Sequence, residues 1–371
     1  MNKFQSSTGP TKIEEIRSFE TFTQKNDDLS NCTIRNIDFS NKNLDWAKIN
    51  VDHSTFIGCT FKTADLSYLI SLCTMIFNEP KGLPYQVYRS SVYSYEELNK
   101  TVDNVTIDLT IYNHFSKYRD IRNINETLYQ RSHDHAIDEA LLDVLDSKND
   151  RKSLGFMGGH SVKRDSDVFK NSALLAFKLA KEGYFIVTGG GPGIMEAANM
   201  GAYFANYSEK DLLESIDYIA QQAHYTNKNY EAYAQNIKEK FPDGRESLSI
   251  PTWFYGHEPS NAFSKYIAKY FSNAVREDTL LAICLHGIVF CPGSAGTIQE
   301  VFADAAQNHY VTYDFVSPMV FYGTDYYQKK LPVMPLLTNL SSNKDYSKFI
   351  LNTDNQEEII DFIKDRPPLK N

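Results

Sequence analysis

Three glycine-bearing turns hold the residues whose types and spacing could carry chemistry. They are GGHS at 158–161, TGGGPG at 188–193 and PGSAGT at 292–297, each between a short apolar run and a helix-like segment. Such a turn presents unpaired backbone N–H groups at a helix N-terminus, where the helix dipole favours an anion. Glycine is needed because a Cβ would keep a phosphate from the backbone. Together the turns predict a phosphorylated ligand, although each alone fits a plain strand-to-helix turn equally well.

Two familiar phosphate-binding patterns are missing from the sequence. The Walker A pattern GxxxxGK[ST] does not occur, which argues against phosphoryl transfer by a P-loop. The cluster Gly189–Gly193 does not complete GxGxxG, because Ile194 occupies the last glycine position. The cluster also follows the second apparent strand rather than the first. A dinucleotide-dependent dehydrogenase is therefore a poor interpretation.

The third turn runs into a threonine and a glutamate, Thr297 and Glu300. A carboxylate beside a phosphate-binding turn can stabilise a developing positive charge or activate water. The same Thr-x-x-Glu spacing is that of a capping box, in which the two side chains satisfy the helix's own N–H groups. The spacing alone favours the cap, whereas the surrounding PGSAG turn favours a site.

Two further segments carry candidate site residues. Arg276, in the segment NAVRED, is either a charge partner of the carboxylate or an exposed helix charge paired with Glu277 or Asp278. His257 and Glu258 lie in the loop WFYGHEPSN, which is rich in proline, glycine and aromatic residues and could close over a base. Both are candidate contacts to the base, and both fit equally a role in bracing the loop.

Strands that alternate with helices must position these turns. Apolar runs at 154–157, 184–188, 287–291 and 318–322 predict strands, and the apolar periodicity at 168–182 and 263–274 predicts amphipathic helices. The stretch 202–260 has the composition of a polar insertion with a helical middle. Strands with glycine at their exits, alternating with helices, are typical of βαβ units and a parallel sheet. We expect residues 151–371 to form a doubly wound, Rossmann-like α/β nucleotide-binding domain.

A period of five residues marks the segment 27–70. Such a period suits neither a helix nor a single strand, but it suits a narrow solenoid in which each step turns a corner. The segment resembles the pentapeptide-repeat family, which implies a small right-handed β-solenoid with an unknown partner. The alternative is a few irregular strands with a chance period. The large apolar residues of the series are Leu29, Ile34, Phe39, Leu44, Ile49, Phe56, Phe61 and Leu66.

The remaining N-terminal segments carry fewer signals. Residues 1–26 are polar and predict a flexible tail or a short helix. Residues 71–150 predict a mostly helical connector, with helices at 95–100 and 121–145. Within the second helix, His133 and His135 flank an aspartate. Because neighbouring side chains on a helix diverge, they are poorly placed to share a metal ion.

The composition limits the class of protein. With a net charge of −9, the chain of 371 residues is a poor candidate for non-specific binding to nucleic acid or to an anionic membrane. No stretch has the apolar length of a membrane span, and the N-terminus lacks the apolar core of a secretory signal. Five cysteines without CxxC spacing fit reduced thiols. We expect a cytoplasmic protein with no metal, no cofactor, no nucleic-acid partner and no membrane partner.

Two of the turns are specific enough to suggest a family. The segment GGGPGIM at 189–195 resembles the GGGxxGLM segment of the LONELY GUY-type (LOG) family, and PGSAGTIQE at 292–300 resembles its PGGxGTxxE signature. The two motifs occur in the same order, and the likeness covers about 170–200 residues. In two places the chain departs from the family: Ser294 replaces a glycine, and no lysine follows Arg276.

The resemblance implies a Rossmann-like fold, a homodimer and hydrolysis of the N-glycosidic bond of a nucleoside 5′-monophosphate. Glu300 would be the catalytic carboxylate and Arg276 its charge partner. The alternative is a non-catalytic nucleotide sensor, with the N-terminal repeat as its interaction module. The residues expected to bind phosphate or nucleotide are Gly158, Gly159, Ser161, Gly189, Gly190, Gly191, Gly193, Gly293, Ser294, Gly296 and Thr297.

Overall fold

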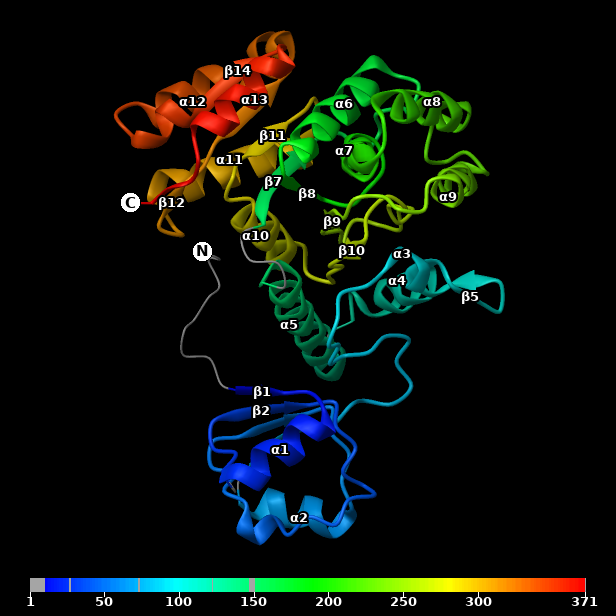
Figure 1. Cartoon of the computed structure of the whole chain (residues 1–371), viewed down its shortest axis with the longest axis vertical. Coiled ribbons are helices and arrows are strands. Elements are labelled where there is room, and N and C mark those ends of the chain that lie inside the picture. The colour runs from blue at the N-terminus through cyan, green and yellow to red at the C-terminus, as the bar shows by residue number, and fades with distance from the viewer. Residues whose placement is uncertain (1–10, 27, 73, 122, 147–150, 371) are drawn as a thin grey trace. The chain divides into compact units, whose positions relative to one another are not determined.

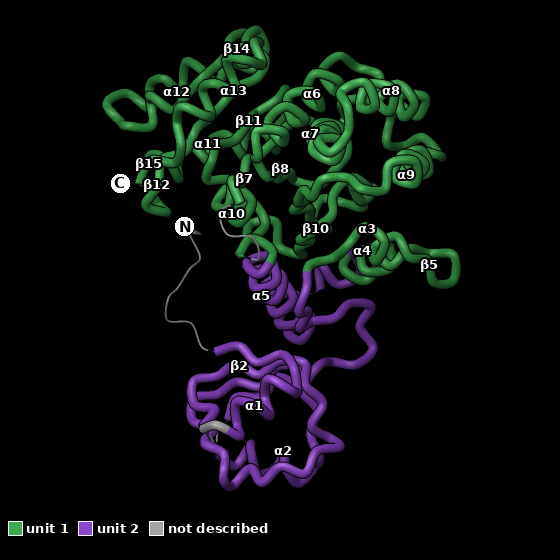
Figure 2. The backbone as a smooth tube through the Cα atoms, viewed as in Figure 1, with its two compact units in different colours: residues 1–3, 92–115, 144–371 green, residues 4–91, 116–143 purple. Residues whose placement is uncertain are grey.

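The computed structural model describes residues 11–26, 28–72, 74–121, 123–146 and 151–370. The chain forms two compact units, which Figure 2 shows in different colours. Of the described residues, unit 1 contains those within Val92–Phe115 and Val144–Asn371, and unit 2 contains those within Phe4–Ser91 and Ser116–Asp143. The predicted connector 71–150 is therefore shared between the two units rather than forming a part of its own.

A seven-stranded parallel sheet forms the centre of unit 1, in the order β10-β9-β8-β7-β11-β13-β14. Within this sheet, the first strand along the chain is β7. The next three strands, β8 to β10, are added outward on one side of β7, and the chain then returns to add β11 on its other side. The order reverses between β7 and β11, which makes that place the topological switch point of a doubly wound fold. The strands are β7 (Lys152–Met157), β8 (Tyr184–Thr188), β9 (Leu248–Ser249), β10 (Tyr266–Ile267), β11 (Ile288–Phe290), β13 (Met319–Tyr322) and β14 (Ile350–Thr353).

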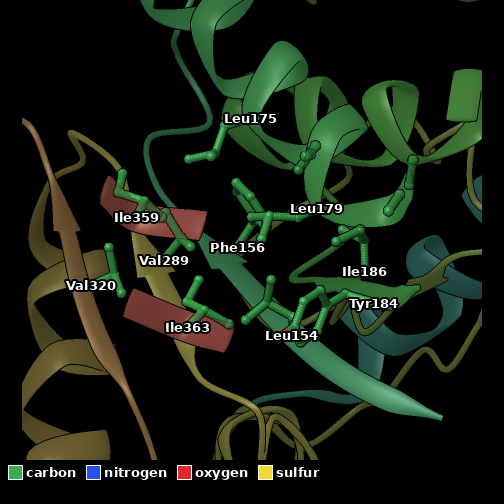
Figure 3. Close-up of a cluster of buried hydrophobic side chains, with 14 of the residues drawn as sticks. Leu154, Phe156, Leu175, Leu179, Tyr184, Ile186, Val289, Val320, Ile359 and Ile363 are labelled. Atoms are coloured by element: carbon green, nitrogen blue, oxygen red, sulfur yellow. The ribbon is translucent and has the colours of Figure 1, made fainter. Parts of the chain in front are cut away.

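The predicted α/β fold is thus confirmed, and the four predicted strands correspond to β7, β8, β11 and β13. These strands are almost entirely buried because helices cover both faces of the sheet. On one face lie α6 (Asp167–Lys181), α7 (Ile194–Tyr203) and α13 (Gln356–Asp365), whose apolar side chains pack on those of the strands (Figure 3).

Helices α10 (Asn273–Ile283), α11 (Ala295–Tyr310) and α12 (Val333–Ser341) pack in succession, α10 on α11 and α11 on α12. Side chains alternate along β7: Leu154 and Phe156 belong to the core under α6, whereas a Cβ on Gly155 would meet Cys284 at the end of α10. The second helical layer therefore covers the opposite face.

One predicted helix is wrong. The i, i+3, i+4 spacing at 263–274 predicts an amphipathic helix, but the structure has strand β10 there, and α10 begins only at Asn273. Most of the segment is buried, so it is apolar on every side and its spacing only imitates a helical stripe. The insertion before it holds α8 (Glu209–Ile219) and α9 (Tyr230–Lys240), in agreement with the predicted helical middle.

The segment 92–115 adds smaller elements to unit 1 (Figure 1). Tyr93 forms an antiparallel bridge with Ile267 of β10, and this pairing joins the segment to the edge of the main sheet. The elements are α3 (Tyr95–Asn99), β5 (Thr101–Val102), β6 (Val105–Thr106) and most of α4 (Ile107–Tyr118); β12 (Phe315–Val316) and β15 (Leu369–Lys370) form a separate pair near the C-terminus.

Unit 2 is built on a four-stranded parallel sheet, β1-β2-β3-β4. Thr33 pairs with Thr55, so β3 lies 22 residues beyond β2, which is four five-residue steps plus the two-residue slip of the sequence. The strands and helices are β1 (Thr11–Ile13), α1 (Ile16–Asn26), β2 (Cys32–Arg35), β3 (Thr55–Ile57), α2 (Thr63–Ser71), β4 (Met75–Phe77) and most of α5 (Ile124–Asp146).

The core of unit 2 contains Leu29, Ile34, Phe39 and Phe56 of the five-residue series, and others of the series are partly buried against it. The inward direction of these residues agrees with the predicted period, while the right-handed β-solenoid itself stays a prediction. Of the two alternatives for 1–26, the short helix is present as α1, whereas a flexible tail is wrong from Thr11 onward, because β1 and α1 occupy 11–26 and bury Phe19. Residues 1–10 lie outside the described residues.

The structure also places the two histidines of α5 and bears on metal ligands and membrane spans. His133 is buried and His135 is exposed, so the two rings point apart as expected. In the described part of the chain, no group of three or more His, Cys, Asp and Glu side chains is placed to hold a metal ion. None of the described helices combines the length and the apolar character that crossing a membrane requires.

Candidate functional site

The third glycine turn leaves the N-terminus of α11 open. β11 ends at Phe290, and α11 begins at Ala295 with Ser294 as its N-cap, whose side chain makes no capping hydrogen bond. Ser294, Ala295 and Gly296 are exposed. The first amides of a helix have no partner within the helix, so these N–H groups can receive an anion. The turn also lies at the switch point of the sheet, where ligands of doubly wound folds bind.

Thr297 and Glu300 do not form a capping box. Because α11 begins at Ala295, both residues lie inside the helix, and both are buried. A Cβ on Gly293 would overlap the Thr297 hydroxyl and lie 3.0 Å from the backbone nitrogen of Gly159. This is the close approach that requires glycine in the PGSAGT turn. The capping-box interpretation of the Thr-x-x-Glu spacing is therefore excluded.

The three turns meet at one place. The backbone nitrogen of Gly159 donates to the carbonyl oxygen of Pro292 at 3.0 Å, and that of Ile194 donates to the carbonyl of Gly159 at 3.2 Å. A Cβ on Gly158 would lie 2.7 Å from the Ile194 side chain, so the first turn packs directly on the start of α7. Ser161 is exposed in the same loop. The three turns therefore converge at the carboxyl ends of the strands.

The second turn differs from the third. The nitrogen of Gly190 donates to Thr188 Oγ1 at 3.1 Å, and that of Gly191 donates to Met195 Sδ at 3.4 Å. Gly190 through Gly193 are buried, and Glu258 Oε2 lies 2.8 Å from the position of a Cβ on Gly191. These amides are already paired and a carboxylate lies beside them. The geometry therefore does not favour the second turn as a place for phosphate.

Two polar residues of α7, Glu196 and Asn199, connect this helix to neighbouring segments. Asn199 Oδ1 accepts from Thr188 Oγ1 at 2.6 Å and from Asn261 Nδ2 at 2.9 Å, so it connects β8 to the loop after β9. Glu196 accepts a two-pronged hydrogen bond from the Arg164 guanidinium. Arg164 is buried in this pair and is not available to a ligand.

Arg276 joins two carboxylates. Its Nη1 lies 3.6 Å from Glu300 Oε1, its Nη2 lies 3.6 Å from Glu277 Oε2, and Nη2 donates to Asn273 Oδ1 at 2.9 Å. The three charged residues are at least nine-tenths buried. Within the part of the chain that the structure describes, Arg276 Nε and Glu277 Oε2 have no hydrogen-bond partner. The predicted pairing of Arg276 with Glu300 is present, together with a pairing to Glu277.

Burial raises the pKa of Glu300 to about 8. The Arg276 guanidinium lowers this pKa, but at 3.6 Å it makes no hydrogen bond to the carboxylate, and the Glu277 carboxylate opposes it. Loss of hydration therefore decides the direction. A carboxyl group with a pKa near neutral pH is a suitable proton acceptor, since it can take a proton in one step and release it in the next.

His257 is turned toward a buried ion pair. Its Nε2 lies 3.3 Å from Asp108 Oδ2, and Lys269 Nζ donates to the same carboxylate at 2.8 and 2.9 Å. Burial alone would raise the pKa of Asp108, but the Lys269 ammonium and the His257 ring hold it well below its usual range. His257 thus braces its loop, and Glu258 is the member of the pair that lies against a glycine turn.

Sequence reasoning missed Asp108, Asn273 and Tyr255. Asp108 lies in the predicted connector, more than a hundred residues from its partners, and no motif marks it. Asn273 lies one helical turn before Arg276, a spacing that could have suggested contact. It donates from Nδ2 to the Tyr255 hydroxyl at 3.0 Å.

No family model and no curated protein matches the chain. Among solved structures, it is similar to the molybdenum cofactor binding protein of Rippkaea orientalis, with 18% identity over 59% of this chain and 98% of that one, at a TM-score of 0.37. For the molybdenum cofactor carrier protein of Chlamydomonas reinhardtii the values are 14%, 58%, 98% and 0.39, and for TM1055 they are 15%, 58%, 99% and 0.34. Such low values leave the assignment of the site to the geometry of this chain.

Proposed function

We propose that unit 1 binds a nucleoside 5′-monophosphate and hydrolyses its N-glycosidic bond, releasing the free base and ribose 5-phosphate. The observation that carries the proposal is the open N-terminus of α11 at the switch point, with Glu300 on the same helix beside Arg276. Glu300 lies five residues beyond Ala295, or about 7.5 Å along the helix axis. That spacing is on the scale of a ribose 5-phosphate.

In this proposal the 5′-phosphate lies at the first turn of α11, where the exposed amides of Ala295 and Gly296 donate to it. Backbone amides at a helix N-terminus bind an anion without a basic side chain, which suits a chain with a net charge of −9. The second glycine turn supports the neighbouring loop instead of binding phosphate. Its Glu258 carboxylate would accept hydrogen bonds from the base.

Glu300 acts as the proton acceptor. Water attacks the anomeric carbon as the bond to the base breaks, the electron pair of that bond leaves with the base, and the proton of the water passes to the Glu300 carboxylate. The protonated Glu300 then returns that proton to the departing base. In its ionised form the carboxylate also stabilises the positive charge that develops on the sugar ring. Arg276 holds the carboxylate in place.

The resemblance of 189–195 and 292–300 to the LOG family supports the same reaction. The chain departs from the family signature at two positions. Ser294, in place of a glycine, is the exposed N-cap of α11, and Glu277, in place of a lysine, is a buried carboxylate. Ser294 leaves the helix amides open, so the turn can still receive a phosphate. The homodimer that the resemblance implies stays a prediction.

The second candidate is a nucleotide sensor without turnover. One observation favours it: Arg276 is shared by two carboxylates, and burial keeps much of Glu300 protonated at neutral pH. Such a site could bind a nucleotide and fail to accept a proton. The N-terminal repeat would then serve as the interaction module of the sensor.

Incubation of the full chain with AMP, GMP, IMP, CMP and UMP, each alone, tests the proposal, with Glu300→Gln as control. The expected result is free base and ribose 5-phosphate from the wild type only. A nucleotide that raises the melting temperature without any product would support the sensor instead. Neither product nor stabilisation by any of the five nucleotides would refute both candidates.

A further inference from the structure

The loop between β9 and β10 is fixed at both ends. Trp253 is fully buried and donates from its indole nitrogen to Asp108 Oδ1 at 2.8 Å. At the other end, Asn261 is buried and donates to Asn199 Oδ1 at 2.9 Å. His257 lies against Asp108 between these two points. The loop therefore holds its position, and only its tip is left to project.

The tip presents an aromatic ring to solvent. Tyr255 is 66% exposed, while Trp253 and Asn261 at the two ends of the loop are buried. Gly256 follows it with φ of +147°, a backbone angle that side chains disfavour, and a Cβ there would meet no atom within 4 Å. Glycine at this position serves the sharp change of chain direction. An exposed ring on an anchored loop is a ready surface for a flat ligand.

The hydroxyl of that ring is tied to the candidate site. Asn273 donates from Nδ2 to the Tyr255 hydroxyl at 3.0 Å, and Arg276 donates to Asn273 Oδ1 at 2.9 Å. Arg276 Nη1 in turn lies 3.6 Å from Glu300 Oε1. Asn273 uses both ends of its amide in this chain of contacts. The loop tip is thus two hydrogen bonds away from the guanidinium beside Glu300.

The loop also contacts the second glycine turn through Glu258. Glu258, three residues after Tyr255, reaches the position of a Cβ on Gly191. Arg276 Nη1 lies 3.8 Å from the position of a Cβ on Gly189. In the proposed site the glycosidic bond lies near Glu300, and Arg276 contacts both Glu300 and the surroundings of Gly189, so the base would extend from Glu300 toward this turn.

We infer that Tyr255 is a positioning residue with two functions: its ring stacks on the base of the bound nucleotide, and its hydroxyl holds Arg276 in place through Asn273. The inference rests on the proposed function and adds the residue that recognises the base. Stacking accepts any base, because every base has an aromatic face. It explains why the tip is aromatic and exposed, and the hydrogen bonds explain why the ring is a tyrosine.

Two variants separate the two functions in the full chain. Tyr255→Phe keeps the ring and removes the hydroxyl, and Tyr255→Leu removes both. Affinity for AMP and for ribose 5-phosphate is measured by calorimetry, and kcat and KM are measured for AMP over pH. Tyr310→Leu is the matched control, because Tyr310 is 78% exposed at the far end of α11, about 22 Å from Ala295.

The expected results differ between ligands. Tyr255→Leu should weaken AMP binding about tenfold and leave ribose 5-phosphate binding unchanged, because only AMP carries a base. Tyr255→Phe should keep the affinity for AMP within about threefold and lower kcat about tenfold, because Arg276 loses its support. Asn273→Ala should lower kcat to the same extent, and the double variant with Tyr255→Phe should lower it no further.

Other outcomes overturn the inference. An unchanged AMP affinity in Tyr255→Leu would refute stacking, and an equal loss for AMP and ribose 5-phosphate would show only a damaged site. Additive effects of Tyr255→Phe and Asn273→Ala would refute the connection to Arg276. If the wild type binds AMP without turnover, the hydrolase proposal fails, while the AMP and ribose 5-phosphate affinities still decide on stacking. A wild type that binds neither ligand would refute the proposed function and this inference together.

Discussion

The second and third glycine turns have similar sequences and different local structures. In the third turn, Ser294, Ala295 and Gly296 are exposed and the first amides of α11 are open. In the second, Gly190 and Gly191 are buried, and their amides donate to a hydroxyl and a thioether of the same segment. One turn is ready for an anion, and the other is already satisfied.

The difference teaches that glycine content does not by itself identify an anion site. What matters is whether the amides have partners and where the turn lies in the sheet. The third turn follows β11, directly beside the reversal in strand order, whereas the second follows β8, one strand away from it. The following predictions test this distinction in order of decreasing expected effect.

The largest effect is expected from alanine at the two turns. Gly293→Ala should weaken AMP binding more than tenfold, because its Cβ would overlap the Thr297 hydroxyl and press on the backbone of Gly159. Gly191→Ala should change the affinity by less than about threefold, because its Cβ would meet only the ends of the flexible Glu258 and Met195 side chains. Calorimetry on both variants measures this, and equal losses would contradict the distinction.

A smaller effect concerns the pH dependence of turnover. Because Glu300 accepts a proton, kcat/KM should rise with pH, with a midpoint near the Glu300 pKa of about 8. Glu277→Gln should move the midpoint to lower pH, since the Glu277 carboxylate raises that pKa; Arg276→Gln should move it to higher pH, since the guanidinium lowers it. Shifts of about one pH unit are expected from groups at this distance. Shifts of the same sign in the two variants would refute this assignment.

Glu300 also predicts a pH dependence of stability. Its pKa is about 8 in the folded chain and near 4.5 when unfolded, so between these values the folded state keeps a proton that the unfolded state has released. Stability relative to Glu300→Gln should therefore fall as pH rises from about 5 to 8, by on the order of 2–4 kcal/mol. Urea unfolding of both proteins at pH 5 and pH 8 measures this change, and a wild type that gains stability relative to Glu300→Gln as pH rises would contradict the raised pKa.

The smallest effect is expected at the departure from the family signature. Ser294→Gly restores the glycine, but Ser294 is exposed and its side chain makes no capping hydrogen bond. AMP affinity should change by less than about threefold. A large gain would show that the serine, and not the backbone, limits phosphate binding.

The fold of unit 1 could be predicted because its long buried strands read as apolar runs with glycine at their ends. Strands β9 and β10 have two residues each, too short for a period to appear. The segment 263–274 produced a false helix prediction. Because it is buried on nearly all sides, it lacks the contrast between an apolar and a polar face by which an amphipathic helix is recognised. In unit 2 the five-residue period placed Phe39 and Phe56 inward, whereas the polar composition of 1–26 left a tail or a short helix open and concealed β1.

The candidate site could be predicted only in part. The pairing of Arg276 with Glu300 follows from family motifs, and the structure has the two side chains 3.6 Å apart. In the second turn, the amide of Gly191 is satisfied by the Met195 side chain, which the folded turn brings back to it. His257 is held by Asp108, which lies in a distant segment of the sequence. Contacts of this kind arise from tertiary structure and cannot be predicted from a local sequence pattern.

The most direct test of the central claim is a crystal structure of Glu300→Gln with bound AMP, since this variant should bind the nucleotide and leave it intact. The account predicts the 5′-phosphate within hydrogen-bonding distance of the backbone nitrogens of Ala295 and Gly296, with the glycosidic bond near residue 300. A phosphate bound at Gly190 and Gly191 instead would contradict it.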